Sequence, residues 1–599
     1  MNIKNIKIYF IFFITFFLIL LSFLISNYIG KKNYVNKKKI INASEYNVTK
    51  SYFVDKNNIG GYGCDDNWIG IIEKPFCTIG KALLLVGPGE GIFIRGGNYD
   101  SFLVDKSGSD GKQIVIVGYN PEKPKIDGGF GIKIKDGSFI TIGGFELTNT
   151  TGSWKGGITI SNGNFNIIEN NIIHDISSIN VSGIWIENGS NNKVLNNQVS
   201  NTGWTGIYIK STGNNSNNEI AYNKSSNNIL GQGNSDGIGL NGVGLTNNNI
   251  HNNIVYGNSD DGVDVWNTSQ NLISANIAYN QQGSGDGNGI KAGGSTTGGN
   301  NIIVGNISYN NKSSGFDSNG SGGNKYYNND SFKNGHYGFN DSWKNSSCTP
   351  ISCKTTYINN IGFNNVDGNL AVNEYTETSH NNIWFSDQEG ASVLYKGHKY
   401  VNLQDFFLAS GFDNPNNSNL SSIQLNPQFV NTQNSDFHLL SSSPAIDKGD
   451  PANSGLINPI YNNVVDIGAY EFISNTTITV TPSNTPTATP TAVPTNVPIN
   501  TVTPTPTVTI ISSNTPTPTK EAPTSTPSNT PTATPTAVPT NVPINTVTPT
   551  PTVTIISSNT PTPTSASISP TVVKLLQTGI LKSFMYWIPT GIILIGLFF

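Results

Sequence analysis

Three carboxylates fall within five residues of the stretch GNSDDGVDVWNTS, residues 257–269. They are Asp260, Asp261 and Asp264, in a chain of which only 12% of the residues are charged. Carboxylates at this density repel one another unless a cation lies between them. A fourth, Asp236, stands in the related stretch NSDGIGL, 24 residues before Asp260. These residues can therefore do chemistry together if the fold gathers them around a cation.

Calcium is the cation that suits such a set. Ca²⁺ binds about six to eight oxygen ligands in flexible geometry, whereas Mg²⁺ prefers few carboxylates and keeps its water. Any single Asp-Gly pair is more often a turn former, which is the simpler interpretation of Asp236 and Asp261. Asp264 argues against turn chemistry alone, because it stands inside an expected strand, where aspartate is depleted. We therefore predict that Asp236, Asp260, Asp261 and Asp264 bind calcium.

The elements that must position these residues are copies of one short unit: glycine, an apolar residue, any residue, then an apolar or small residue. The spacings between successive units are 23, 31, 25, 27, 26 and 23 residues, and the units begin at Gly183, Gly206, Gly237, Gly262, Gly289, Gly315 and Gly338. A second series runs out of phase with the first and begins at Asn171, Asn197, Asn253, Asn276 and Asn306. Two short strands per period, Asn-rich turns and no helical periodicity predict a parallel β-helix with an asparagine ladder in one turn. An antiparallel sandwich is the alternative, but it gives no reason for a fixed period.

Side chains alternate along a strand, so the apolar residue after each glycine is expected to face inward and the next residue outward. The outward residues of consecutive units then form one column, which reads Trp185, Tyr208, Gly239, Asp264, Lys291, Asp317 and Asn340. Asp264 and Lys291 come from consecutive coils and should be neighbours. A solvated lysine is the ordinary interpretation of Lys291. Beside a divalent cation, however, the pKa of a lysine falls, and a neutral amine is a competent general base.

These motifs resemble the pectate lyases of polysaccharide lyase family 9. The similar stretches are NSDGIGL, GNSDDGVDVWNTS, GNGIKAGG and SSGFDSNG, and the resemblance covers roughly residues 50–345. It implies a secreted, right-handed parallel β-helix that cleaves α-1,4-linked polygalacturonate by β-elimination. It also implies that Lys291 is the catalytic base that removes the C5 proton, and that the calcium ligands are Asp236, Asp260, Asp261 and Asp264. Asp317 matches a recurrent position of the family, to which we assign no role.

Other function classes share parts of this pattern. Polygalacturonases share the fold and use paired carboxylates, but their GHG and RIK motifs are absent from the sequence. A β-helix adhesin or glycan-binding protein with structural calcium needs no amine beside the metal, so Lys291 discriminates against it. A lyase, epimerase or hydrolase that acts on another uronic-acid polysaccharide stays open. Trp185, Tyr208 and Trp266 either stack on sugars or simply favour strand structure.

Both ends of the chain are apolar. Residues 8–25 follow Lys4 and Lys7 and are either an uncleaved membrane anchor or a signal peptide. Thr/Pro-rich residues 474–570 contain one 39-residue stretch twice, at 481–519 and 526–564, and such a segment forms an extended, solvated, disordered stalk. The hydrophobic tail at the C-terminus is expected to associate with the membrane.

We therefore expect four regions: a signal or anchor segment (1–45), an all-β catalytic domain (46–473), a stalk (474–570) and an anchor (571–599). A short helix at residues 79–86 should cover one end of the β-helix, and the stretches SPAIDKGDP and VVDIGAYEF the other. This organisation predicts an extracellular, cell-surface-anchored monomer whose partners are an acidic polysaccharide and the membrane, with no nucleic acid. In an exported protein, Cys64 with Cys77 and Cys348 with Cys353 are expected to form local disulfides.

Overall fold

The computed structural model describes residues 46–151, 155–230, 233–294, 298–342, 354–374, 376–412, 421–451 and 464–473. The expected anchors and stalk, and the cysteines at positions 348 and 353, lie outside these residues. Within the described part of the chain, no helix is both long and apolar enough to cross a membrane.

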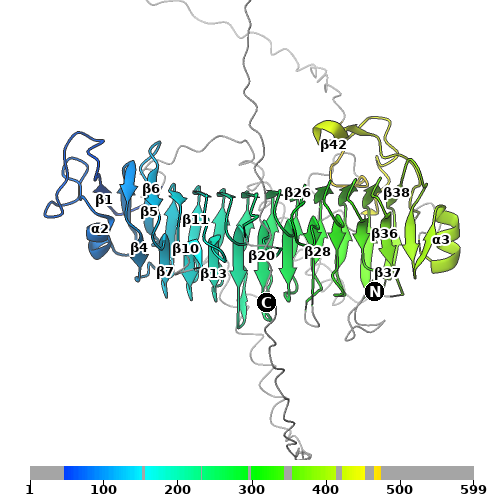
Figure 1. The fold of residues 1–599 in the computed structure, drawn as a ribbon, viewed down its shortest axis with the longest axis horizontal. Coiled ribbons are helices and arrows are strands. Elements are labelled where there is room, and N and C mark those ends of the chain that lie inside the picture. The colour runs from blue at the N-terminus through cyan, green and yellow to red at the C-terminus, as the bar shows by residue number, and fades with distance from the viewer. Residues whose placement is uncertain are drawn as a thin grey trace, which may run out of the picture. The chain divides into compact units, whose positions relative to one another are not determined.

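The described residues form a right-handed parallel β-helix built from three long sheets (Figure 1). Sheet 1 has thirteen strands, which are β1 (Lys50–Val54), β2 (Glu90–Ile94), β5 (Ile114–Gly118), β8 (Ile140–Gly143), β11 (Ile167–Glu169), β14 (Lys193–Leu195), β18 (Glu219–Ala221), β22 (Asn249–His251), β25 (Leu272–Ser274), β28 (Ile302–Val304), β31 (Lys325–Tyr327), β34 (Thr355–Ile358) and β37 (Thr376–His380). Sheet 2 also has thirteen, which are β4 (Phe102–Val104), β7 (Ile132–Lys135), β10 (Gly156–Ser161), β13 (Ser182–Glu187), β16 (Ile207–Lys210), β20 (Ile238–Asn241), β24 (Val263–Trp266), β27 (Ile290–Lys291), β30 (Phe316–Asp317), β33 (Tyr337–Asn340), β36 (Gly368–Val372), β39 (Val393–Tyr395) and β40 (His398–Tyr400).

Sheet 3 has twelve strands, which are β3 (Gly97–Tyr99), β6 (Pro124–Asp127), β9 (Glu146–Thr148), β12 (Ile172–His174), β15 (Gln198–Ser200), β19 (Lys224–Ser226), β23 (Ile254–Tyr256), β26 (Ile277–Tyr279), β29 (Ile307–Tyr309), β32 (Asp330–Phe332), β35 (Ile361–Phe363) and β38 (Ile383–Phe385). Two small two-stranded sheets pair β17 (Asn215–Ser216) with β21 (Leu245–Thr246), and β41 (Phe429–Asn431) with β42 (Asp436–Leu439). Among the described residues, the helices are α2 (Ile79–Leu85), α3 (Leu403–Ser410) and a 3₁₀ turn (Thr432–Asn434).

The predicted β-helix is confirmed, but each coil contributes three strands rather than the two expected. The Gly-apolar series forms sheet 2, and the series with Asn171 forms sheet 3. The strand that was missed belongs to sheet 1. Its copies, such as β11 and β14, are three residues long with a single fully buried side chain, Ile168 or Val194.

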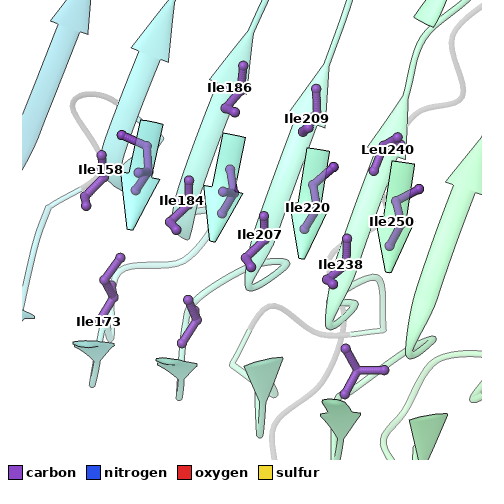
Figure 2. Packing of buried hydrophobic residues seen from close by; sticks show 14 of the residues in the cluster. Ile158, Ile173, Ile184, Ile186, Ile207, Ile209, Ile220, Ile238, Leu240 and Ile250 are labelled. Carbon is purple, nitrogen blue, oxygen red and sulfur yellow. The ribbon is translucent and has the colours of Figure 1, made fainter. Parts of the chain in front are cut away.

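Stacked isoleucines fill the interior of the coils. Ile158, Ile184, Ile207 and Ile238 pair in register across β10, β13, β16 and β20, and all four are fully buried. Figure 2 shows this column facing Ile220 and Ile250 of sheet 1. The inward-facing residue after each repeated glycine is therefore as predicted. This core fixes the register of the outward-facing residues, because a slip by one residue would expose the isoleucines.

An asparagine ladder runs along the turn between sheets 1 and 3. Each side-chain amide donates to the side-chain oxygen of the asparagine one coil further on, at 2.9–3.1 Å, through Asn171, Asn197, Asn223, Asn253, Asn276, Asn306, Asn329, Asn360 and Asn382. The predicted ladder is thus present. A second ladder, from Asn192 to Asn324, follows the turn between sheets 2 and 1. Ladders of this kind satisfy buried amides that would otherwise cost free energy.

The two ends of the β-helix are covered by helices. At one end lies α2, as predicted, with Ile79, Ala82 and Leu83 buried, and Cys64 is bonded to Cys77 in the preceding loop. At the other end lies α3, which buries Leu403 and Phe406.

The expectation that SPAIDKGDP and VVDIGAYEF close this second end is wrong. Both segments lie along the side of the last coils, where Ala445 and Ile467 pack in one cluster with Ile361 and Ile383 of sheet 3. The side chain of Asn328 donates to the carbonyl of Asp466 at 2.8 Å. The physical reason is that sheet 3 presents apolar outward side chains there, and these need a cover.

Candidate functional site

The outer face of sheet 2 carries the predicted column. Tyr208, Gly239, Asp264, Lys291 and Asp317 pair in register from β16 through β20, β24 and β27 to β30. Lys291 Nζ lies 3.9 Å from Asp264 Oδ2. The prediction that these two residues of consecutive coils are neighbours is therefore confirmed.

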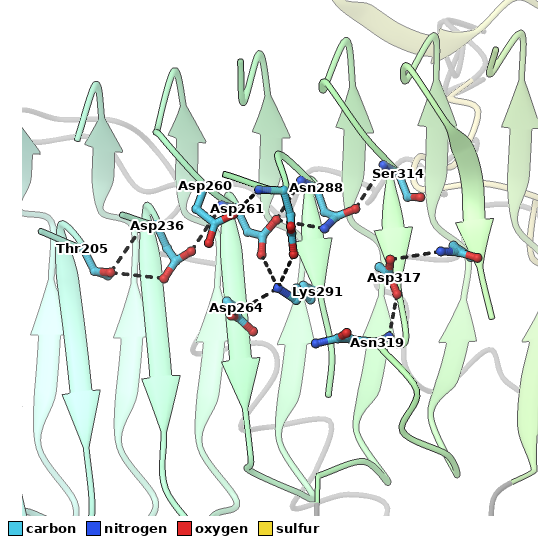
Figure 3. A network of polar contacts seen from close by, with 12 residues as sticks. Thr205, Asp236, Asp260, Asp261, Asp264, Asn288, Lys291, Ser314, Asp317 and Asn319 are labelled. Atoms are coloured by element: carbon cyan, nitrogen blue, oxygen red, sulfur yellow. Dashed lines mark hydrogen bonds and ion pairs between the residues drawn. The ribbon is translucent and has the colours of Figure 1, made fainter. Parts of the chain in front are cut away.

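The other predicted carboxylates join the column at the start of the strands. One oxygen each of Asp236, Asp261 and Asp264 lie within 4.8 Å of one another, and Asp260, Asp261 and Asp286 form a second such group. Figure 3 shows the contacts of the Lys291 amine with Asp261 and Asp264, and Asp236 further along the sheet beside Thr205. The structure thus brings together all five residues predicted from the sequence. Asp286, in the loop before β27, is the member that sequence reasoning missed.

Hydrogen bonds from the main chain and from neutral side chains hold these carboxylates in place. Asn288 donates to Asp261 Oδ1 from its main chain at 2.7 Å and from its side chain at 3.0 Å. Thr205 Oγ1 donates to Asp236 Oδ2 at 3.1 Å. Asp264 Oδ1, in contrast, is buried and has no hydrogen-bond partner among the described residues. A buried carboxylate oxygen left in this way is costly unless it binds a ligand.

Burial makes the group electrostatically unfavourable without a cation. Asp236, Asp260, Asp261 and Asp264 are between 0% and 9% exposed. Burial raises the pKa of each of them, and repulsion from the neighbouring carboxylates adds to this effect, whereas the charge of Lys291 opposes it. For Asp260, burial and the charge of Asp261 raise the pKa to about 7. A site that resists the charged form of four carboxylates is suited to a cation that restores it.

The residues present fit calcium. Ca²⁺–oxygen distances are about 2.3–2.6 Å, so two oxygens bound to the same ion lie no more than about 5 Å apart. The oxygens of Asp236, Asp261 and Asp264 meet that limit. The donors are all oxygens, and the unpartnered Asp264 Oδ1 supplies a free ligand atom.

Lys291 is the cation that the structure itself supplies. Its Nζ lies 2.9 Å from Asp286 Oδ2 and 3.1 Å from Asp261 Oδ2, and its side chain is 7% exposed. Burial alone would lower the pKa of Lys291, but Asp261, Asp264 and Asp286 raise it well above the ordinary value. These three carboxylates therefore hold the amine in its protonated form.

A cleft of about 250 Å³ opens beside the cluster, lined among others by Tyr208, Gly239, Asp264, Trp266 and Lys291. Trp266 is 36% exposed. Trp185, in contrast, is 6% exposed and packs beside Tyr208 with ring centroids 4.8 Å apart. Asp317 lies one coil beyond Lys291, where it accepts a hydrogen bond from Asn340 at 3.1 Å and takes no part in either carboxylate group.

A family model described as the Pel9A-like right-handed β-helix region matches residues 62–182 and 175–382. The chain belongs to the Pel9A-like right-handed β-helix family. Both carboxylate groups and Lys291 lie inside the second matched range. No curated protein matches the chain.

Several solved structures are similar to this Pel9A-like chain. Pectate lyase Pel9A is 20% identical, with a TM-score of 0.46, 71% of this chain covered and 96% of that chain. A rhamnogalacturonan lyase is 21% identical, with a TM-score of 0.37 and coverages of 56% and 87%. An alginate lyase from Paenibacillus sp. is 16% identical, with a TM-score of 0.34 and coverages of 46% and 93%.

Proposed function

We propose that this protein is a calcium-dependent pectate lyase that cleaves α-1,4-linked polygalacturonate by β-elimination. The observation that carries the proposal is a buried amine and a group of buried carboxylates from consecutive coils that share one open cleft. Membership of the Pel9A-like family supports it, since the solved Pel9A is described as a pectate lyase.

In this proposal Asp236, Asp260, Asp261 and Asp264 hold the metal. Calcium held by these residues would supply a positive charge beside the uronate carboxylate of the substrate, which would make the proton at C5 more acidic. Lys291 takes that proton. The electron pair of the C–H bond forms the C4–C5 double bond, the C4–oxygen bond breaks, and the departing oxygen takes a proton from solvent.

Lys291 must be neutral to act, and its surroundings determine when that happens. The carboxylates of Asp261 and Asp264 hold the proton on the amine. A divalent cation held by Asp261 and Asp264 would offset their share of that attraction, while Asp286 keeps its own, and so would bring the pKa of Lys291 closer to the working pH.

Two other reaction types make different demands. Hydrolysis of the glycosidic bond needs a protonated and an ionised carboxyl group on opposite sides of the bond, about 5–9.5 Å apart, whereas these carboxylates crowd around one point. A protein that only binds the glycan needs no buried amine against the metal ligands. The geometry therefore favours elimination.

Product analysis in ¹⁸O-labelled water tests the reaction type. We expect the full chain with calcium to convert hexagalacturonate into fragments of which one is unsaturated and none carries ¹⁸O. Chelation should abolish the reaction. Incorporation of ¹⁸O would show hydrolysis, and the absence of any cleavage by a protein that binds both calcium and hexagalacturonate would identify a glycan-binding protein.

We also propose that the enzyme works at the cell surface. The support lies in the sequence, where a Thr/Pro-rich stretch separates the β-helix from an apolar C-terminus. Protease treatment of intact producing cells should release the lyase activity into the medium. Activity that stays inside the cells under that treatment would contradict the proposal.

A further inference from the structure

The cleft extends beyond the carboxylate cluster over a position without a side chain. Gly239 on β20 lies between Tyr208 and Asp264 in the outward column. A Cβ atom at Gly239 would lie 2.9 Å from Tyr208 Cδ2 and 3.1 Å from Asp236 Oδ2. Glycine therefore leaves the floor of the cleft open directly beside the carboxylate cluster.

Aromatic side chains line this part of the cleft, and two of them are supported from behind. Trp204, Tyr208 and Trp266 all line it. A Cβ atom at Gly294 would lie 2.3 Å from Trp266 Cε3, so the indole ring of Trp266 lies directly against the main chain there. Tyr208 packs on the buried ring of Trp185. Rings fixed in this way lose little conformational entropy when they bind a ligand.

Polar groups complete the lining. Asn241 and Asn234 line the same cleft as the aromatic rings, and Asn241 pairs in register with Trp266. A pyranose ring has C–H groups that pack on an aromatic face and hydroxyl groups that bond to amides and carboxylates. About 250 Å³ is below the usual volume of a drug-sized site, which is about 300 Å³ or more, and suits a single ring.

We propose that Trp204, Tyr208 and Trp266 form a binding subsite, floored by Gly239, for one sugar ring of an acidic polysaccharide. This inference rests on the proposed function, because the ring is the neighbour of the uronate residue whose carboxylate is held at the calcium site. The subsite contributes binding, while Lys291 and the aspartates carry the chemistry.

Substitution of Trp266 tests the subsite. In the full chain carrying Lys291→Ala to prevent turnover, calorimetry with hexagalacturonate and calcium should show binding about tenfold weaker for Trp266→Ala, a loss equivalent to ~1.4 kcal/mol. Trp266→Phe keeps an aromatic face and should retain most of the affinity. The matched control is Trp68→Ala, in the N-terminal loop and distant in sequence from the residues of the subsite. In the active chain, Trp266→Ala should raise KM far more than it lowers kcat.

The possible results of these experiments test the proposed subsite and the proposed lyase function separately. Calcium affinity should be the same with and without Trp266, and a loss of calcium affinity equal to the loss of hexagalacturonate affinity would overturn the subsite. Undiminished hexagalacturonate binding by both Trp266→Ala and Trp204→Ala, in a chain that still cleaves with Lys291 in place, would also overturn the subsite and leave the lyase function intact. A wild-type chain that neither binds nor cleaves hexagalacturonate would refute both. If Trp266→Ala does not fold, Trp204→Ala gives the same comparison.

Discussion

At the scale of single residues, the site consists of buried charged groups. Each of them alone would destabilise the fold, and the opposite charges of the carboxylates and the Lys291 amine offset that cost. Asp264 could be predicted because it interrupts a strand pattern, and Lys291 because it occupies the same place one coil later. Asp286 could not be predicted, since its loop has no alternation and no fixed spacing. Its contact with the Lys291 amine at 2.9 Å depends on the path of the loop.

Asp286→Asn should move the pH profile of the proposed elimination reaction. Asp286 raises the pKa of Lys291, so its neutralisation lowers that pKa and makes the neutral amine available at lower pH. The acidic limb of the pH dependence of kcat/KM should shift downward by up to about 1 pH unit. Asp387→Asn, on an exposed loop, should leave the profile in place. A shift to higher pH would contradict the assignment of Lys291 as the base.

Calcium binding should weaken in acid while the calcium-free fold gains stability. The pKa of Asp260 in the folded protein is about 7, above its ordinary value near 3.8. This carboxyl group therefore stabilises the calcium-free fold fully below the unfolded pKa, and that contribution is lost as the pH rises through about 7. Calcium needs the ionised form, so its affinity follows the opposite trend.

Denaturant unfolding with and without calcium at pH 8 and pH 5 checks this behaviour. The increase in the free energy of unfolding on addition of calcium should be large at pH 8 and small at pH 5. A larger increase at pH 5 would show that the buried aspartates are not the calcium ligands.

At the scale of elements, the repeats predict two of the three sheets. Sheet 2 is marked by its repeated glycines, and sheet 3 by the asparagine that precedes its strands from β12 to β38. Sheet 1 also has an asparagine before its strands from β11 to β31, but a strand such as β18 places only one apolar side chain, Ile220, between a glutamate and an alanine, so its strand pattern is weak. The periodicity alone therefore places the carboxylate column correctly while it undercounts the strands.

Asn253→Ala should interrupt the asparagine ladder near its middle. Asn253 accepts from Asn223 at 3.0 Å and donates to Asn276 at 2.9 Å, so the substitution leaves buried groups without partners. The expected loss is about 2–3 kcal/mol in the free energy of unfolding, measured in denaturant. Asn249→Ala, which faces outward on the same coil, should cost less than about 0.5 kcal/mol. Equal losses for the two variants would refute a stabilising role of the ladder.

At the scale of the whole molecule, a stack of coils is stable only if its ends are covered. The sequence predicts that α2 covers one end, but it does not predict that α3 covers the other. The reason is that the apolar residues of VVDIGAYEF are equally suited to the side of sheet 3, where they lie. The sequence shows that a segment needs burial, but the choice between two apolar surfaces is decided by the three-dimensional fit.

Phe406→Ala should expose the end beyond β40. Phe406 is fully buried and its ring lies about 6.1 Å from those of Tyr395 and Tyr400. The variant should lose about 3–5 kcal/mol of stability and self-associate through the uncovered strands, as light scattering would show. Leu408→Ala, on the same helix but 73% exposed, is the control. Unchanged stability of Phe406→Ala would contradict a covering role for α3.

The central claim is that calcium and Lys291 act together in an elimination. The most direct measurement is the ultraviolet absorbance of the unsaturated product during incubation of the full chain with polygalacturonate. The absorbance should rise with calcium, stay flat with chelator and stay flat with Lys291→Ala, while Lys325→Ala on sheet 1 behaves as wild type. A calcium-dependent rise that persists in Lys291→Ala would contradict the role of this lysine, and no rise in the wild type would contradict the lyase function itself.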